Sequence, residues 1–135
     1  MNFDKIVELT HVLKDIHNTN IRCKHFTFIL HKSKILSIGI NNPKKTHPKN
    51  LKSKYKDRHN RDISEYVGIH SELSAILKYR AESYHKYTLI NTRIGVNGKL
   101  ANSHPCAGCT CMLSQLNFRR IYYTTSQGEF KELTL

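Results

Sequence analysis

The stretch Pro105-Cys106-Ala107-Gly108-Cys109 decides how the rest of this chain is interpreted. Two cysteines three positions apart on one helical turn point the same way, so their thiolates can share a metal ion. Earlier in the chain, His70-Ser71-Glu72 begins a second segment whose apolar residues recur at helical spacing. A histidine from that neighbouring helix would supply a third ligand. Three protein ligands leave one coordination position for a water molecule of lowered pKa, which is typical of catalytic zinc.

The other two cysteines do not complete a four-ligand structural site. Cys111 lies two positions beyond Cys109, about 200° around a helix, so we expect it to face away from the metal as a small packed side chain. Cys23 stands alone, and three cysteines crowded together do not look like a framework of loop-closing disulfides. A C-x-x-C pair alone could also serve redox chemistry or structural zinc. The prediction of a catalytic metal therefore depends on the combination with His70.

Size and composition predict one globular domain. The chain has 135 residues, of which 39% are hydrophobic and 24% charged, so we expect residues 1–135 to form a single domain around one core. The apolar stretches are far shorter than the roughly 18 residues of a membrane span. The acidic residues Asp4, Glu8 and Asp15 are not typical of a signal peptide. We therefore expect a cytoplasmic protein with no membrane partner.

Apolar periodicity and turn residues predict the order of the secondary-structure elements. In chain order we expect a helix ending near residue 16, strands over 25–30 and 35–40, a helix over 68–80, a strand over 87–94, a helix beginning at Pro105, and strands over 120–125 and 129–133. A proline suits the first position of a helix. The order α-β-β-α-β-α-β-β predicts an α/β sandwich of two or three layers around a mixed five-stranded sheet.

The charge of the chain is strongly positive. Lysine and arginine outnumber aspartate and glutamate by 22 to 10, a formal net charge of +12, which favours a polyanionic partner or an anionic substrate. Much of the excess lies in a polar segment over about 43–64, which we predict to be a loop. Charge runs are usually solvated loops, and the alternative is an arm that contacts phosphates. The residues of this predicted nucleic-acid contact are Lys44, Lys45, Lys49, Lys52, Lys54, Lys56, Arg58 and Arg61.

The motif H-x-E followed by P-C-x-x-C is the signature of the zinc-dependent nucleobase deaminases. On these residues the chain resembles the cytidine/deoxycytidylate deaminase superfamily, and the predicted element order is similar to that family's over most of the chain. Gly39-Ile40-Asn41 resembles the family's G-x-N, whose asparagine contacts the sugar. The turn at Gly128 resembles the branch whose last two strands form a hairpin, without the C-terminal helices of the deoxycytidylate branch. The resemblance implies the deaminase α/β(/α) sandwich.

The resemblance also implies a role for each residue of the motif. His70, Cys106 and Cys109 would bind one Zn²⁺ per chain, and Glu72 would be the catalytic proton shuttle rather than a ligand. Glu72 would take a proton from the zinc-bound water, pass it to ring N3 and later protonate the departing amine. A first-turn carboxylate is also favoured by the helix dipole alone, so the role depends on its neighbours.

Departures from the family bear on the substrate. Free-nucleoside deaminases usually have a cysteine as first ligand and an acidic residue soon after the sugar-binding asparagine. Here the first ligand is a histidine, and Asn41 is followed by Asn42-Pro43-Lys44-Lys45. Basic residues at that place suit a phosphate, of a nucleotide or of a strand. We expect Asn41, Ser103 and His47 to contact the substrate.

Three functions follow from these patterns. The first is deamination of cytosine to uracil in single-stranded DNA or RNA, for which Tyr55, Tyr66, Tyr122 and Tyr123 offer stacking faces, although at least one of the last two belongs to the core. The second is deamination of free deoxycytidylate or cytidine in pyrimidine metabolism. The third is a non-catalytic zinc-containing nucleic-acid-binding protein, which Glu72 argues against. Adenine as the target base stays open because the chemistry is common to both bases, and no pattern indicates the number of subunits.

Overall fold

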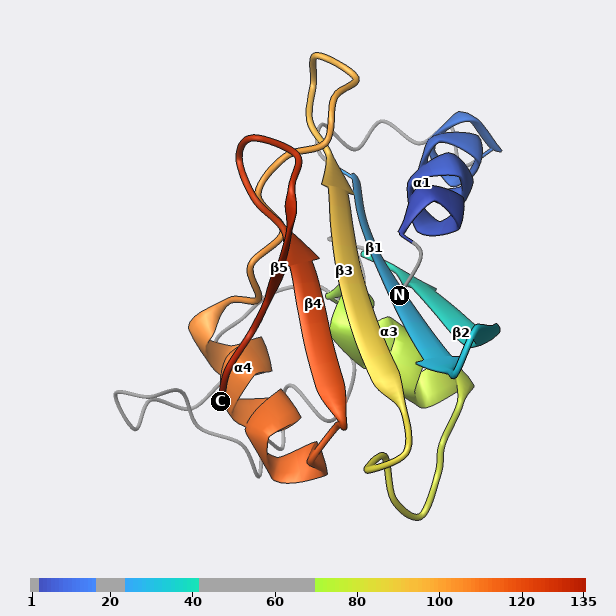
Figure 1. Cartoon of the computed structure of the whole chain (residues 1–135), viewed down its shortest axis with the longest axis vertical. Helices are drawn as coiled ribbons and strands as arrows, with labels where there is room; N and C mark the ends of the chain where they lie inside the picture. Colours follow the sequence, from blue (N-terminus) through green and yellow to red (C-terminus); the bar gives the residue numbers. More distant parts are fainter. Residues whose placement is uncertain (1–2, 17–23, 42–69) are drawn as a thin grey trace.

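The computed structural model describes residues 3–16, 24–41 and 70–135, and its centre is a mixed five-stranded sheet (Figure 1). Its elements are α1 (Asp4–Ile16), β1 (Lys24–His31), β2 (Lys34–Ile40), α3 (Ser71–Lys78), β3 (Thr88–Ile94), α4 (Ala107–Leu116), β4 (Arg120–Thr124) and β5 (Phe130–Glu132). The order of these elements and the mixed sheet confirm the predicted fold class. In the described part of the chain, no helix is long and apolar enough to cross a membrane.

The strands lie in the order β2-β1-β3-β4-β5. β1 is antiparallel to both β2 and β3, and β3 and β4 are parallel because α4 carries the chain back across the sheet between them. β5 runs antiparallel to β4, which gives the expected C-terminal hairpin. Its turn includes Gly128 at a φ of +77°, a conformation that glycine adopts without strain.

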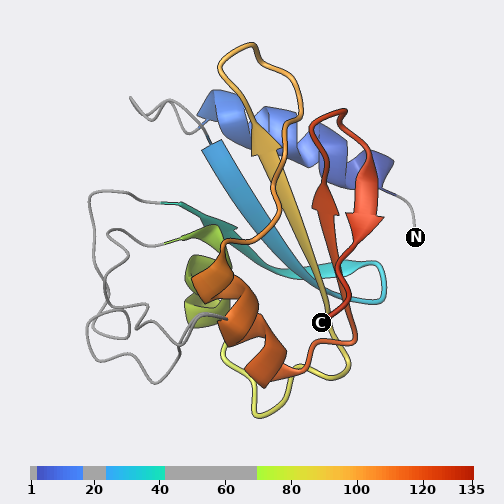
Figure 2. The ribbon, with the colours of Figure 1, turned by 90° about the vertical axis from the view of Figure 1, so that its left-hand side faces the viewer.

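Helices cover both faces of the sheet, α1 on one side and α3 with α4 on the other (Figures 1 and 2). Each face has its own buried cluster. Phe26 and Phe28 of β1 pack toward α1, whereas Ile29 of the same strand packs toward α3 and α4. The expected single core is therefore two half-cores that share the sheet. A strand covered on both faces needs apolar residues pointing both ways, which explains why Phe28, Ile29 and Leu30 of β1 are apolar in succession.

Helix α4 begins later than predicted. Pro105 lies before the helix, and Cys106 is its N-cap, with an extended conformation (φ −66°, ψ 170°). The Cys106 sulfur accepts a hydrogen bond from the Cys109 N–H at 3.4 Å, which satisfies one of the free donors of the first turn. A cysteine therefore takes the place of the usual serine or aspartate cap. The later start puts both thiols at the positive end of the helix.

The other differences concern element ends. α3 ends at Lys78, before the predicted residue 80, because Tyr79 has left the helical region of backbone conformation (φ −133°, ψ 86°). β5 covers only Phe130–Glu132 of the predicted 129–133. Residues 68–69 of the predicted second helix lie outside the described residues.

Candidate active site

Two helix starts meet on the same face of the sheet. His70 is the N-cap of α3, and Cys106 and Cys109 occupy the cap and first turn of α4. α3 is held on β2 by Ser37, whose hydroxyl donates to the carbonyl oxygen of Ala75 at 2.8 Å. α4 follows the loop that leaves β3. The packing of the two helices on the sheet therefore brings together residues that are far apart in the sequence.

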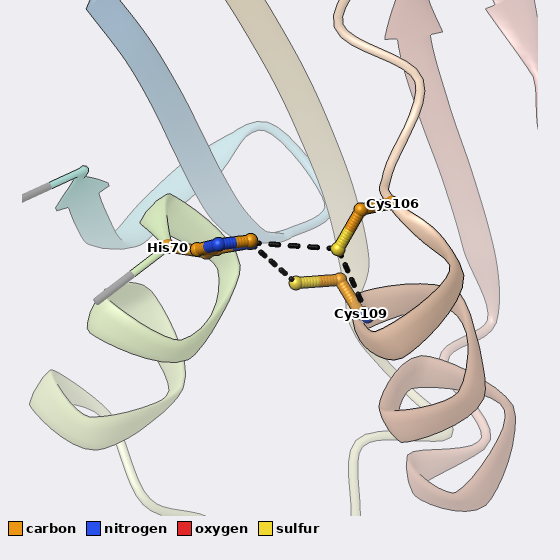
Figure 3. Close-up of side chains that lie close together, drawn as sticks. All are labelled: His70, Cys106 and Cys109. Carbon is orange, nitrogen blue, oxygen red and sulfur yellow. Dashed lines mark hydrogen bonds between the residues drawn. The ribbon is translucent and has the colours of Figure 1, made fainter. Parts of the chain in front are cut away.

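His70, Cys106 and Cys109 form a compact group of metal-binding atoms (Figure 3). The ligand atoms of the three all lie within 4.8 Å of one another. Nδ1 of His70 is 3.5 Å from the Cys106 sulfur and 3.3 Å from the Cys109 sulfur. Tetrahedral zinc, with bonds of about 2.3 Å to sulfur and about 2.0 Å to nitrogen, separates such atoms by roughly 3.5 Å. The donor types and their spacing therefore fit a three-ligand zinc site.

The ionisation of the group is coupled. Hydrogen bonds from the Cys109 thiol and from His70 lower the pKa of Cys106 to about 4, against the effect of burial. The same hydrogen bond with Cys106, together with burial, raises the pKa of Cys109 well above its usual value. The hydrogen bond to Cys106 also raises the pKa of His70. The low pKa favours the thiolate of Cys106, which the side chains of Cys109 and His70 and the Cys109 N–H stabilise. A metal ion would take the place of the two side-chain protons.

Glu72 lies in the first turn of α3 beside this group but is not one of its ligands. Only 6% of its surface is exposed, and burial is the largest of the effects that raise its pKa. Its negative charge raises the pKa of His70 and of Cys109, so the carboxyl lies within electrostatic reach of the ligands. Asn91 of β3 donates from Nδ2 to its Oε2 at 3.1 Å, and Ser71 donates to its Oε1 at 3.1 Å. A buried carboxyl group of raised pKa next to a metal site can take up and release a proton.

No family model matches the chain, and no curated protein matches it. Solved structures do match it, among them two of one enzyme. The dCMP deaminase of cyanophage S-TIM5 in complex with dCMP and dUMP matches with a TM-score of 0.53 and 18% identity, over 93% of this chain and 84% of the other. The apo form of the same enzyme matches with a TM-score of 0.50 and 19% identity, over 93% and 86%. This chain has the deaminase fold.

Within the deaminase fold, two of the predicted substrate-contact residues are described. Asn41, directly after β2, accepts a hydrogen bond from the His25 N–H at its Oδ1 (3.0 Å), and its own N–H donates to the His25 carbonyl at 3.3 Å. Ser103 is 2% exposed. Its hydroxyl donates to the carbonyl oxygen of Asn91 at 2.9 Å and accepts from the Thr124 N–H at 2.7 Å. The Ser103 hydroxyl therefore joins two strands of the sheet and faces protein rather than the surface.

The remaining predicted contacts lie outside the described residues. They are His47, Lys44, Lys45, Lys49, Lys52, Lys54, Lys56, Arg58 and Arg61, together with Tyr55, Tyr66 and Cys23. Of the two tyrosines of β4, Tyr122 packs its ring edge to face with Phe3, 5.1 Å between centroids, and Tyr123 packs in the same way with His104 at 4.8 Å. Cys111 lies outside the group of His70, Cys106 and Cys109, as expected. It is partly buried, and its sulfur is 3.6 Å from Gln115 Nε2.

Sequence reasoning missed Thr27 and Asn91, which lie behind Glu72. Both are buried polar residues inside strands, with 0% and 3% of their surface exposed. Asparagine is depleted in strands, so Asn91 in the middle of β3 was a usable signal. A buried amide needs hydrogen-bond partners, and the partner of functional interest near Asn91 is Glu72.

Proposed function

We propose that the protein is a zinc-dependent hydrolase that converts cytosine to uracil. One observation supports this function above others: a three-ligand metal group and a buried, non-ligating carboxyl come from the same two helix starts. A structural zinc site would have a fourth protein ligand, and it would not need Glu72. Redox chemistry at Cys106 and Cys109 would not need His70 at 3.3 to 3.5 Å from both sulfurs.

Each residue of the site has a task in this reaction. His70, Cys106 and Cys109 would hold zinc, which when bound supplies an activated water for attack at C4 of the ring. Glu72 would carry the protons, first to ring N3 and then to the departing amine. Burial keeps its pKa above that of an exposed glutamate, so it binds the proton more readily between the two transfers.

For the substrate we infer cytosine in single-stranded DNA or RNA. The net charge of +12 supports a polyanionic partner. Within the described residues, Arg93 lies at the C-terminal end of β3 and directly opposite His25 in the β1–β3 pairing. The Arg93 charge is one of the effects that lower the pKa of His25, and so is the charge of His70. Arg93 and His70 therefore both lie within electrostatic reach of His25. The positive charge of Arg93 would favour a phosphate next to the target base.

Free deoxycytidylate is the second candidate. The fold likeness favours it, because the matching solved structures are of a dCMP deaminase, one of them in complex with dCMP and dUMP. In either case Asn41 would contact the sugar. Its Oδ1 is occupied by the backbone of β1, so its Nδ2 group would be the part that reaches the ligand.

The test compares zinc-loaded protein on a cytosine-containing single-stranded oligonucleotide, deoxycytidylate and cytidine. The matched control is Glu72→Gln, which preserves shape and removes the proton carrier. Uracil formed in the oligonucleotide, and lost in the variant, supports the first substrate, and turnover of the monomers alone supports the second. A zinc-loaded protein that deaminates neither cytosine nor adenine but binds single strands would overturn the enzyme proposal in favour of a zinc-containing nucleic-acid binder.

Salt dependence separates the substrates further. Each strand phosphate contacted lowers the logarithm of the binding constant by about 0.7 per decade of salt for a single strand, so a polynucleotide gives a steep slope and a mononucleotide a shallow one. Replacement of Lys44, Lys45, Lys49 and Lys52 by alanine should reduce the slope on the oligonucleotide. An equal loss of activity on both substrates would contradict a strand-contacting segment.

A further inference from the structure

We propose that Thr27 and Asn91 are positioning residues that hold the Glu72 carboxyl in its working orientation, through a ring of polar contacts, three of them hydrogen bonds, that Ser71 completes. The inference rests on the proposed function, because it assigns these residues to the reaction that Glu72 would serve. Neither Thr27 nor Asn91 belongs to the H-x-E or P-C-x-x-C motif.

The ring has four contacts. Asn91 Nδ2 donates to Glu72 Oε2 at 3.1 Å, and Ser71 Oγ donates to Glu72 Oε1 at 3.1 Å. Thr27 Oγ1 lies 2.8 Å from Ser71 Oγ and 2.6 Å from Asn91 Oδ1. It donates its single proton to Asn91, and the Ser71 proton goes to Glu72, so the contact between the two hydroxyls closes the ring without a proton of its own. The exposed fractions of all four residues are 6% or less. The contacts are therefore shielded from water, where such bonds are strongest and an unpaired member costs most.

The orientation of the Asn91 amide follows from its surroundings. Nδ2 faces two acceptors, Glu72 Oε2 and the carbonyl oxygen of Ser103 at 3.4 Å, whereas Oδ1 faces the Thr27 hydroxyl. A reversed amide would place its oxygen against both acceptors. The two acceptors fix which end of Asn91 points at Glu72, and the Thr27 hydroxyl holds the opposite end of the amide, so Thr27 acts on the carboxyl without touching it.

The sheet holds the two residues in this relation. Thr27 and Asn91 are direct partners in the β1–β3 pairing, so their side chains lie side by side on the face that carries α3. Glu72, in the first turn of α3, contacts Asn91 of this pair directly. Because both of its oxygens have a protein partner, rotation of the carboxyl breaks a contact. Each oxygen has a second lone pair, which remains for proton transfer.

Buried polar groups of this kind could also serve only to stabilise the fold. The test must therefore separate an effect on the orientation of Glu72 from an effect on the stability of the protein. Thr27→Val keeps the shape and removes the hydroxyl, and Thr27→Ser restores it. The matched control is Thr92→Val. Thr92 is equally buried, but its hydroxyl bonds that of Thr10 in α1, on the opposite face of the sheet, at 2.9 Å.

With zinc-loaded protein, Thr27→Val and Asn91→Asp should lower kcat by roughly 10- to 100-fold, the usual cost of losing an outer-shell partner, with little change in KM. Thr27→Ser should recover most of the loss, and Thr92→Val should leave kcat unchanged. Asn91→Asp should cost little further in a Glu72→Gln background. A kcat loss in Thr92→Val equal to that in Thr27→Val, or a loss confined to KM, would overturn the proposal.

A second readout does not depend on activity. In the NMR spectrum, the two Nδ2 protons of Asn91 should exchange slowly with water, and Thr27→Val and Glu72→Gln should each shift them, whereas Thr92→Val should not. Unshifted signals in Thr27→Val would overturn the ring even in a protein that deaminates cytosine. Shifted signals in a protein without deaminase activity would support the ring while the proposed function failed.

Discussion

Gly39 of β2 lies directly under the backbone of Ser71 at the start of α3. A Cβ at Gly39 would clash with the Ser71 carbonyl oxygen and with the backbone nitrogen of Ala75. The helix therefore rests on a position of the strand that has no side chain. Since His70 and Glu72 are the immediate neighbours of Ser71, the location of the candidate active site relative to the sheet depends on this glycine.

Gly39→Ala should destabilise the protein by about 1–3 kcal/mol or more, because the added methyl group meets backbone atoms that cannot move alone. Urea unfolding checks the change in the free energy of unfolding. The control is Gly95→Ala, whose Cβ would meet nothing closer than the Asn97 side chain at 3.3 Å. Two variants of equal stability would contradict the close packing of α3 on β2.

Removal of the metal should lower stability as well as activity. If His70, Cys106 and Cys109 bind zinc only in the folded state, free zinc at about 1,000 times its dissociation constant adds about 4 kcal/mol to the free energy of unfolding. We expect one zinc per chain by elemental analysis and a lower Tm after chelation. Cys109→Ser should lose the metal and the chelator effect, whereas Cys111→Ser should retain both.

The two ligand thiols should differ in reactivity in the metal-free protein. Cys106 has a pKa of about 4 and is partly exposed, whereas the pKa of buried Cys109 is raised well above its usual value. Because the thiolate is the nucleophile, iodoacetamide at pH 6 should label Cys106 far faster than Cys109, as peptide mass spectrometry can measure. Saturating zinc should protect Cys106. Equal labelling of the two thiols without metal would show that their pKa values do not differ in this way.

His25 should make stability depend on pH. Burial, with further contributions from the charges of Arg93 and His70, lowers its pKa from 6.5 to about 4. The unfolded chain therefore binds a proton near pH 6.5 that the folded chain binds only near pH 4, so protonation favours unfolding. As pH falls through this window, His25 should reduce the free energy of unfolding by up to about 3 kcal/mol.

The measurement for His25 is urea unfolding between pH 4 and pH 7.5. Cys106, whose pKa is about 4, titrates at the lower end of this range, so the informative quantity is the difference in the free energy of unfolding between the wild type and His25→Gln. That difference should fall as pH is lowered from 6.5 to 4. A constant difference for His25→Gln would show that His25 keeps its usual pKa in the folded protein.

The chain-local features could be predicted from sequence. Helical periodicity, strand alternation and turn residues are set by neighbours within a few positions, which is why the order of the elements was correct. The spacing in H-x-E and in P-C-x-x-C determines which side chains lie together at the beginning of each helix. The sequence alone therefore indicated His70, Cys106 and Cys109 as the group of candidate metal ligands. Helix ends were less accurate, since Cys106 caps α4 with its own sulfur, an uncommon cap.

Only the tertiary structure decided which buried residues hold Glu72 in place. Thr27 and Asn91 are 64 positions apart, and Asn91 and Glu72 are 19 apart, yet they bond to one another. Their meeting depends on strand register, because a shift of one residue would turn Thr27 to the opposite face of the sheet. Ser103, in the segment between β3 and α4, also turns its hydroxyl inward, to Asn91 and Thr124. The sequence determined which groups could do chemistry, and long-range strand pairing decided which groups hold them in place.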